Sequence, residues 1–421
     1  MNNKTITILS YGTQGDVEPC IALALALMQA GFGVCLAADK EFESLIQERG
    51  IPSLYYELGL KDFFHSELGK AALSGKDDRQ SRQALNARFQ DAIRRMLDVC
   101  WEASQSSAGV IYSGELLPAG FIAEKLAIPS IITSAMPNLS PTRAFPLIGA
   151  PRIGLGGFGN RLTYCLYRLS WFNRNPAIAQ WLRETVKYPI PSRFKNYLYR
   201  DGRPIPILYS YSEEILPTPK DWNCDTLASG YWFLEPMNHW QPSPSLERFL
   251  ADGPAPIYVG FGSTVGIDPE KVTRIAIGAL RQVGKRGVFV GGWGGVKPCD
   301  LPDSIYYMDY APFAWLFPRM KAVVHHGGAN TMAWGLMAGK PTIVCPFVTD
   351  QFFWSALVPK LGAGPAPLPL KDLTVNNLAQ AINISINNDT MRRRAEAIGA
   401  RLREEDGVGK AVRFIREKFG F

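Results

Sequence analysis

One stretch in the second half of the chain restricts the possible fold more than any other. Residues 322–324 are apolar, residues 325–331 form a glycine-containing turn with polar side chains, and an amphipathic pattern then runs to Gly339. A second apolar segment, residues 341–347, follows and leads directly to the acid–amide pair 350–351. This order predicts a strand, a turn, a helix and a second strand, with the acid–amide pair just beyond it.

The turn in this stretch has the features of a phosphate-binding site. The first N–H groups of a helix have no partner inside the helix, and the helix dipole adds positive potential at the same end. A phosphate group can therefore bind there. The residues that we expect to bind it are His326, Gly327, Gly328, Asn330 and Thr331.

The rest of the chain is long enough for two such units. With 421 residues, two domains of about 200 residues each are the natural expectation. Hydrophobic residues make up 47% of the chain and charged residues 20%, which is typical of folded globular proteins and can fill two cores. Strand and helix patterns alternate in both halves, beginning with an apolar strand at residues 5–9 and a helix at residues 19–30. The sequence therefore predicts an α/β protein with two doubly wound parallel sheets.

A proline-rich stretch between residues 217 and 256 separates the two alternating regions. Because dense proline opposes both helices and central strands, we place the interdomain linker within it. The predicted organisation is an N-terminal domain at 1–228, a linker at 229–253, a second domain at 254–405 and a final helix within 406–421.

The segment from Arg143 to Arg203 is basic and aromatic. It contains eleven Lys or Arg residues and eleven aromatic residues, but only two acidic ones, Glu184 and Asp201. Such a mixture suits contact with a membrane surface, and it equally suits a solvated basic face over a packed aromatic core. No nucleic-acid recognition motif accompanies it, so we expect no nucleic-acid partner.

The cysteines and the apolar runs indicate a cellular location. Seven cysteines are scattered without a Cys-x-x-Cys pair, which favours neither a disulfide framework nor a zinc site. The apolar run after Met1 is too short for a signal peptide, and none reaches the roughly 18 residues that span a bilayer. We expect a cytoplasmic protein, with peripheral membrane contact through residues 143–203 as an open alternative.

Several motifs together resemble one known family. The first group resembles the donor signature of UDP-glycosyltransferases with the two-domain GT-B fold and comprises residues 325–342, 350–351 and 361–365. The second group is similar to the sterol 3-beta-glucosyltransferase branch and comprises residues 11–19, 141–146 and 230–234. This resemblance covers nearly the whole chain. It implies two Rossmann-like domains that face each other across a cleft, with the final helix packing back on the first domain.

The resemblance also implies which residues bind the donor. These residues are Ser263, Tyr310, Phe313, His326, Gly328, Asn330, Thr331, Asp350 and Gln351. His326 would bind the diphosphate, and Asp350 and Gln351 would form hydrogen bonds with the sugar hydroxyls. The sterol branch usually has His-Asp where this chain has Phe313 and Ala314, close to the expected base and ribose contacts.

In the first domain, Asp16 matches the carboxylate that activates the acceptor in this family. Such a base takes the hydroxyl proton while the oxygen attacks the anomeric carbon. The alternative is that Asp16 only caps a helix that begins at Pro19. The candidate acceptor-binding residues are Met136, Phe145 and Trp171.

We therefore expect an inverting transferase that moves a hexose, in first place glucose, from UDP-glucose to the hydroxyl of a lipophilic acceptor such as a sterol. A polyketide, flavonoid or other natural-product aglycone is an alternative acceptor, and a sugar-nucleotide-binding protein or epimerase is an alternative class. Because no Asp-x-Asp pair occurs and His325–His326 has no third ligand nearby in sequence, we expect no metal and no cofactor beyond the UDP-sugar co-substrate. The glycine-rich residues 154–159 fit a dinucleotide fingerprint but follow no strand, so we interpret them as a flexible loop on the acceptor side rather than an oxidoreductase site.

Overall fold

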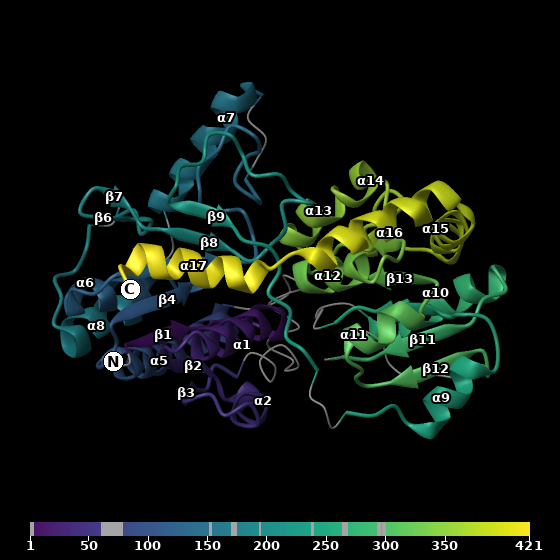
Figure 1. The fold of residues 1–421 in the computed structure, drawn as a ribbon, viewed down its shortest axis with the longest axis horizontal. Coiled ribbons are helices and arrows are strands. Elements are labelled where there is room, and N and C mark those ends of the chain that lie inside the picture. The colour runs from purple at the N-terminus through teal and green to yellow at the C-terminus, as the bar shows by residue number, and fades with distance from the viewer. Residues whose placement is uncertain are drawn as a thin grey trace. The chain divides into compact units, whose positions relative to one another are not determined.

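The computed structural model folds into two compact units (Figure 1). The first unit includes Gly75–Leu234 together with the chain before it up to Leu60 and with Asp406–Phe421, and the second includes Glu235–Glu405. The structure describes residues 4–59, 79–150, 154–169, 175–192, 195–236, 240–262, 268–292, 296 and 300–421. Each unit is built on its own parallel sheet, which confirms the predicted pair of doubly wound α/β units.

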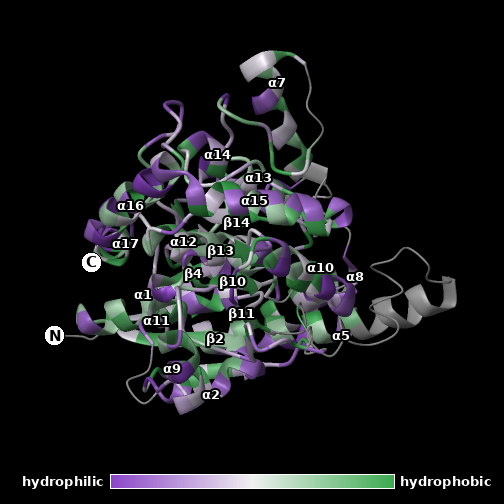
Figure 2. Cartoon of the chain, turned by 90° about the vertical axis from the view of Figure 1, so that its right-hand side faces the viewer, coloured by the Kyte–Doolittle hydropathy of each residue, from purple (hydrophilic) through white to green (hydrophobic). Residues whose placement is uncertain are grey.

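The first unit contains a seven-stranded sheet in the order β3-β2-β1-β4-β5-β8-β9, with every neighbouring pair parallel. The strands are β1 (Thr5–Leu9), β2 (Gly33–Asp39), β3 (Ser53–Tyr56), β4 (Gly109–Ser113), β5 (Ser130–Ser134), β8 (Ile207–Tyr209) and β9 (Thr226–Ala228). They are largely hydrophobic, as β2 is in Figure 2, because both faces of a parallel sheet are covered by helices. The strand order reverses between β1 and β4, which places a crevice at the carboxyl ends of these two strands.

Alternate residues of β1 point to opposite faces of this sheet. Ile6 and Ile8 join a core with helix α1 (Gln14–Gln29) and helix α17 (Gly407–Phe419). On the other face Thr7 Oγ1 donates to the carbonyl of Ala103, 3.0 Å away, in helix α5 (Arg79–Ser104). The first unit therefore has a helix layer on each side of its sheet.

Helix α1 begins earlier than the sequence suggested. We expected a start at Pro19, but the helix begins at Gln14 and Pro19 lies inside it. Thr13 is the N-cap residue, and its N–H donates to the Asp16 carboxylate, which stabilises the earlier start. The proline is accepted five residues inside the helix and is buried against the core.

Helix α17 completes the first unit, although the second unit precedes it in the sequence. It packs along α1, and Lys418 Nζ lies 2.9 Å from Asp225 Oδ1. Phe419 lies over Gly109, where an added Cβ would come within 2.5 Å of the ring. The last helix is thus part of the core of this unit rather than an appendage.

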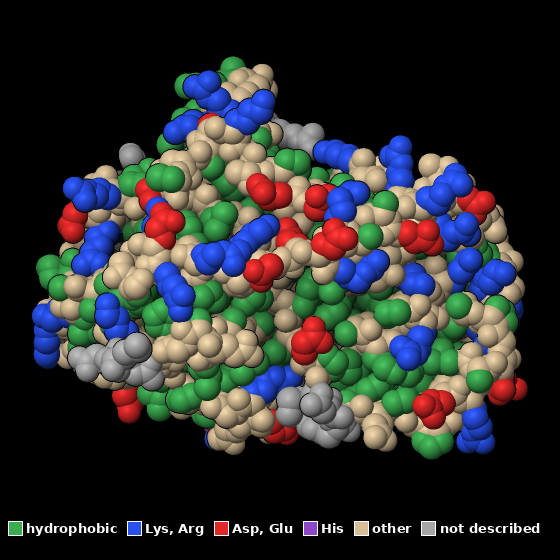
Figure 3. Space-filling view, viewed as in Figure 1, with side chains coloured by type: hydrophobic (Ala, Val, Ile, Leu, Met, Phe, Trp, Pro, Cys, Tyr) green, Lys and Arg blue, Asp and Glu red, His purple; other side chains and the backbone are tan. Residues whose placement is uncertain are grey.

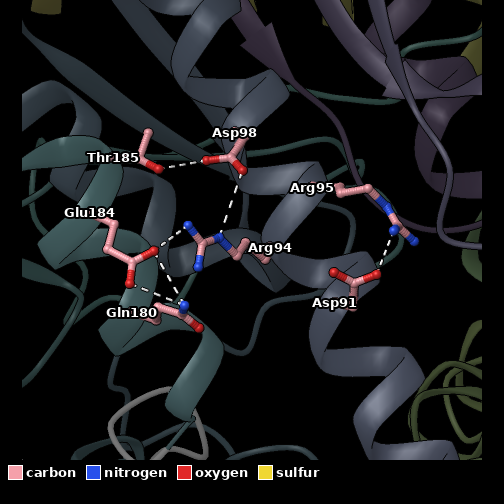
Figure 4. Close-up of polar contacts among 7 residues, drawn as sticks. All are labelled: Asp91, Arg94, Arg95, Asp98, Gln180, Glu184 and Thr185. Carbon is pink, nitrogen blue, oxygen red and sulfur yellow. Dashed lines mark hydrogen bonds and ion pairs between the residues drawn. The ribbon is translucent and has the colours of Figure 1, made fainter.

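Between β5 and β8 the described part of the chain includes helices α7 and α8, which differ in burial. Helix α8 (Pro176–Trp181) and the π-helical turn after it pack on α5, where Arg94 Nη2 lies 2.5 Å from Glu184 Oε2 and Thr185 Oγ1 donates to Asp98 at 2.8 Å (Figure 4). Helix α7 (Gly156–Thr163) covers residues that we had interpreted as a flexible glycine-rich loop, and that interpretation is wrong from residue 156 onwards. Its glycines form the first turn of a helix instead.

The second unit contains a five-stranded parallel sheet in the order β12-β11-β10-β13-β14. The strands are β10 (Ile257–Gly260), β11 (Gly287–Val290), β12 (Ile305–Met308), β13 (Ala322–His325) and β14 (Thr342–Val344). The helices that matter most for packing and for the site are α10 (Pro269–Gln282), α12 (Ala329–Met337), α13 (Thr349–Ser355), α15 (Val375–Asn387) and α16 (Asp389–Glu404). The order reverses between β10 and β13, so the second unit also has a crevice at the ends of two adjacent strands.

The predicted linker is not wholly irregular. Helix α9 (Pro244–Ala251) lies inside it, because proline is tolerated at the first position of a helix and Ser243 caps this one through a bond from Leu246 N at 3.2 Å. Of the helices that the structure describes, none is both long enough and apolar enough to cross a bilayer.

Candidate functional site

The first unit has a pocket at its strand-order reversal. The loops after β1 and β4, together with the ends of β5 and β8, enclose about 300 Å³ of empty space that is open to solvent. Its lining combines two carboxylates with hydroxyl groups and one large aromatic ring. The lining residues are Gly15, Asp16, Pro19, Cys20, Ser113, Glu115, Thr133, Ser134, Ala135, Ser210 and Trp232.

Asp16 is solvent-exposed and lies in the first turn of α1. Its Oδ2 accepts hydrogen bonds from Thr13 N at 2.8 Å and from Thr13 Oγ1 at 3.2 Å. Gly12 has a φ of 123°, and a Cβ at this position would lie 2.3 Å from Asp16 Oδ2, so the turn requires glycine. Asp16 is therefore not the N-cap residue, and the turn holds its carboxylate at the pocket.

A second carboxylate, Glu115, lines the same pocket, and the sequence had not singled it out. Ser113 Oγ donates a hydrogen bond to it. The pKa of Tyr11 is raised to about 12, mainly by burial and to a smaller extent by the nearby charges of Glu115 and Asp16. Burial, then Asp16 and then Glu115 raise the pKa of Cys20 to about 12, so this thiol stays protonated near neutral pH. The two carboxylates thus act on the same side chains.

One sequence signal could have revealed the remaining lining. Ser113, Ser134 and Ser210 all stand at the carboxyl ends of strands, where ligands bind in open α/β sheets. Trp232 belongs to the 230–234 segment that supported the resemblance, and its Nε1 donates to Ser229 Oγ at 2.8 Å.

The expected acceptor residues are only partly near this pocket. Met136 is half-buried and directly follows Ala135 of the lining, and its N–H donates to Ser134 Oγ at 3.0 Å. Phe145 is half-buried in the loop before α7, outside the described lining of the pocket. Trp171 lies outside the described residues.

In the second unit, His325 ends β13 and is fully buried. Its Nδ1 accepts a hydrogen bond from Gly327 N at 2.9 Å. That N–H therefore serves the turn itself, and the expectation that Gly327 also binds a phosphate is not supported.

The imidazole of His326 lies between two glycines, one just after β10 and one at the start of α12. A Cβ at Gly262 would come within 2.8 Å of His326 Cε1, and a Cβ at Gly328 would come within 2.6 Å of His326 Nε2. Gly262 follows β10 and Gly328 immediately precedes α12. The predicted donor residue His326 is thus positioned at the strand-order reversal, with its Nε2 facing the entrance to α12.

Burial lowers the pKa of His326 to about 4. Its Nδ1 is buried and has no hydrogen-bond partner within the part of the chain that the structure describes. The ring is therefore neutral near pH 7, and a neutral imidazole carries one N–H donor and no positive charge.

Helix α12 supplies the positive end of a dipole at the same place. Its first intrahelical bond runs from Met332 N to Gly328 O at 3.0 Å. Asn330 and Thr331 lie in the first turn and are half-buried, and the leading N–H groups of the helix lie at the same end. His326, Gly328, Asn330 and Thr331 are thus brought together as the sequence predicted.

Asp350 and Gln351 lie in the first turn of α13, just past β14. Burial is the main cause that raises the pKa of the Asp350 carboxyl. Gln351 Oε1 accepts from Phe347 N at 2.8 Å and from Val348 N at 3.1 Å, so this oxygen stabilises the loop that leads into α13.

The two residues expected to contact the nucleotide base differ in their surroundings. Tyr310 is exposed, whereas the Phe313 ring stacks on Phe317 with centroids 4.5 Å apart and meets Tyr258 edge-on. Ser263 lies outside the described residues. Within the described residues, no three or more His, Cys, Asp or Glu side chains are grouped so that they could hold a metal ion.

Comparison with known proteins supports this description of the two units. The N-terminal domain model of glycosyltransferase family 28 matches residues 6–145, and the erythromycin biosynthesis protein CIII-like C-terminal domain model matches residues 295–407. The glycotransferase of kitacinnamycin has a similar fold, with a TM-score of 0.70 at 17% identity over 100% of both chains. The calicheamicin glycosyltransferase CalG4 likewise has a TM-score of 0.70, at 16% identity over 100% of this chain and 99% of that one.

Relatives found by sequence share a higher identity with this chain than these two structures do. The sterol 3-beta-glucosyltransferase UGT80B1 of Arabidopsis thaliana is 31% identical over 97% of this chain and 67% of its own length. The sterol 3-beta-glucosyltransferase UGT80A2 of the same plant is 32% identical over 97% of this chain and 64% of its own length. For the sterol 3-beta-glucosyltransferase of Neosartorya fischeri the identity is 33%, and the chain spans only 29% of that protein.

The paired doubly wound units and these matches define a GT-B glycosyltransferase. More particularly, the chain belongs to the UDP-glycosyltransferase family, within the group that contains the sterol 3-beta-glucosyltransferases. The resemblance of the motifs is thereby confirmed.

Proposed function

We propose that the chain transfers glucose from UDP-glucose to the hydroxyl group of a sterol. The sterol 3-beta-glucosyltransferases match 97% of this chain, although it spans two thirds or less of most of them. The observation that carries the proposal is the exposed carboxylate of Asp16 at a pocket on the first unit's sheet. The carboxylates and hydroxyl groups that line this pocket suit the hydroxyl-bearing end of such an acceptor.

In the proposed reaction, Asp16 takes the proton of the acceptor hydroxyl while that oxygen forms a bond to the anomeric carbon of glucose. The bond from the anomeric carbon to the diphosphate oxygen breaks, and its electron pair leaves with UDP. Attack from the face opposite the leaving group inverts the anomeric centre.

The residues of the second unit would hold the leaving diphosphate. The N-terminus of α12 offers backbone N–H groups and the positive end of its dipole, and Thr331 adds a hydroxyl. Neutral His326 would donate one hydrogen bond from Nε2, so the charge on the diphosphate is met mainly by the helix. Asp350 and the amide nitrogen of Gln351 would bind the sugar hydroxyls.

Asp16→Asn tests this proposal. Asparagine keeps an oxygen that can accept from Thr13 N–H, so the turn is preserved while the proton acceptor is lost. We expect the turnover of UDP-glucose and a sterol to fall by about 100-fold or more, with UDP affinity unchanged. Glu18→Gln, two residues further along α1, is the matched control and should retain turnover within about twofold. Full turnover by Asp16→Asn would contradict the proposed base.

We also propose that the region 143–203 brings the protein into contact with a membrane surface. A lipophilic acceptor is dissolved in lipid, and a basic, aromatic segment is suited to that boundary.

A further inference from the structure

We propose that one face of α7 inserts into the surface of an anionic lipid bilayer. We define this α7 apolar face as Leu155, Phe158, Leu162 and Leu166, whose exposed fractions are 59%, 67%, 45% and 45%. Phe158 and Leu162 are four residues apart and share one side of α7, while Leu155 directly precedes the helix and Leu166 lies in the 3-10 helix that follows it. The inference rests on the proposed membrane contact and names the element that makes it.

The side of α7 that packs on the protein carries small and polar residues. Gly159 and Thr163 are buried there. Thr163 Oγ1 accepts from Leu147 N at 2.8 Å and donates to Asn160 O at 2.6 Å. A helix that served only the core would have its apolar side inward, so the observed orientation indicates a second apolar partner.

A carboxylate holds α7 in this orientation. Asp221 accepts hydrogen bonds from Thr142 Oγ1 at 2.7 Å and from Arg143 N at 2.9 Å. The same carboxylate lies 3.5 Å from Arg161 Nη1 on α7, and Asn160 Nδ2 donates to Arg143 O at 3.0 Å. The position of the helix is therefore fixed by polar contacts, and its apolar face is left available.

The charge of this segment selects an anionic surface. Residues 143–169 contain four arginines, Arg143, Arg152, Arg161 and Arg168, and no acidic residue. Figure 3 shows hydrophobic and basic side chains side by side on the α7 protrusion. Apolar groups that enter the acyl boundary beside arginines that meet lipid phosphates form the usual arrangement of a peripheral membrane helix.

Helix α8 and the π-helical turn after it, in the same 143–203 region, do not offer such a face. Trp181 and Leu182 are fully buried, and this part packs on α5 through the polar contacts in Figure 4. For that part the sequence alternative of a packed aromatic core applies. The inserted element is therefore assigned to α7.

The test is co-sedimentation of the full chain with vesicles of phosphatidylcholine and phosphatidylserine at a ratio of about three to one, without donor or acceptor. We expect the wild type to bind. Phe158→Ser/Leu162→Ser should weaken the partition constant at least about tenfold, because it removes two apolar side chains from the inserted face. The matched control is Ile384→Ser, which removes a side chain that is 40% exposed on α15 and should change binding less than about twofold.

Absence of wild-type binding, or equal binding by the double variant and the wild type, would overturn the inference. A change from dimer to monomer in the double variant, seen by analytical ultracentrifugation without an effect on vesicle binding, would show that a second copy of the chain covers this face and would also overturn it. Turnover of a sterol solubilised in cyclodextrin is measured separately, so that loss of vesicle binding and loss of the proposed transferase activity are told apart.

Discussion

The neutral state of His326 has a measurable consequence for stability. Its pKa is about 4 in the folded chain and 6.5 in an ordinary environment. The unfolded chain therefore binds more protons between these two values, and stability is lost as the pH falls through this window. The integrated effect of this one group is about 2.5 kcal/mol between roughly pH 7 and roughly pH 4.5.

The perturbation is His326→Gln, which keeps a polar side chain but cannot titrate. The free energy of unfolding of wild type and variant would be measured with denaturant at both pH values, following the transition of the second unit. The difference between the two proteins should shift by about 2.5 kcal/mol in favour of the variant at the lower pH, since only the wild type loses stability through this group.

Histidine NMR provides the direct measurement. The chain has only four histidines, so the ¹³Cε1 resonance of His326 can be assigned by its absence in His326→Gln. That resonance should not shift between about pH 8 and about pH 5.5 in the ligand-free protein. A His326 pKa near 6.5, or a difference in unfolding free energy that does not depend on pH, would refute the argument that burial keeps the ring neutral.

Two further substitutions test the packing around each site. Gly328→Ala places a Cβ 2.6 Å from His326 Nε2, so the ring must move, and the UDP affinity measured by calorimetry should fall at least about tenfold. Gly154→Ala is the control, because the added Cβ meets nothing within 4 Å. Equal UDP affinities of the two variants would contradict the geometry. Phe419→Ala removes a buried ring from the first unit and should lower its unfolding free energy by about 3–5 kcal/mol. Ile384→Ala changes an exposed position and should lower the unfolding free energy by less than about 1 kcal/mol. A similar loss in both variants would show that α17 is not a core element.

The sequence predicted the strand, turn and helix of residues 322–337 well because their signals are local. Strand, turn and helix follow each other within residues 322–337, so His326, Gly328, Asn330 and Thr331 come together without any long-range contact. The strand bounds Thr5–Leu9 were likewise confirmed, since a short apolar run bounded by polar residues defines them.

The acceptor half depended on contacts between distant parts of the chain. Asp16, Glu115 and Ser210 meet only because β1, β4 and β8 belong to one parallel sheet, and periodicity alone does not give that strand order. The start of α1 was placed too late because we let Pro19 mark it, although the side-chain contact between Thr13 and Asp16 determines the first turn. For α7, local glycine content was a poor guide, because Thr163 and Asn160 fix the helix by tertiary hydrogen bonds.

The return of the chain to the first unit in α17 affects the order in which the protein can be made. Ala411, Phe414 and Ile415 belong to the same core as β1 and α1, so that core stays incomplete on the ribosome until α17 has emerged. The second unit, Glu235–Glu405, is finished earlier and forms an insertion whose two ends both lead into the first unit. During synthesis the turn at His326 can therefore be native while the pocket around Asp16 still lacks the helix that completes the core beneath it.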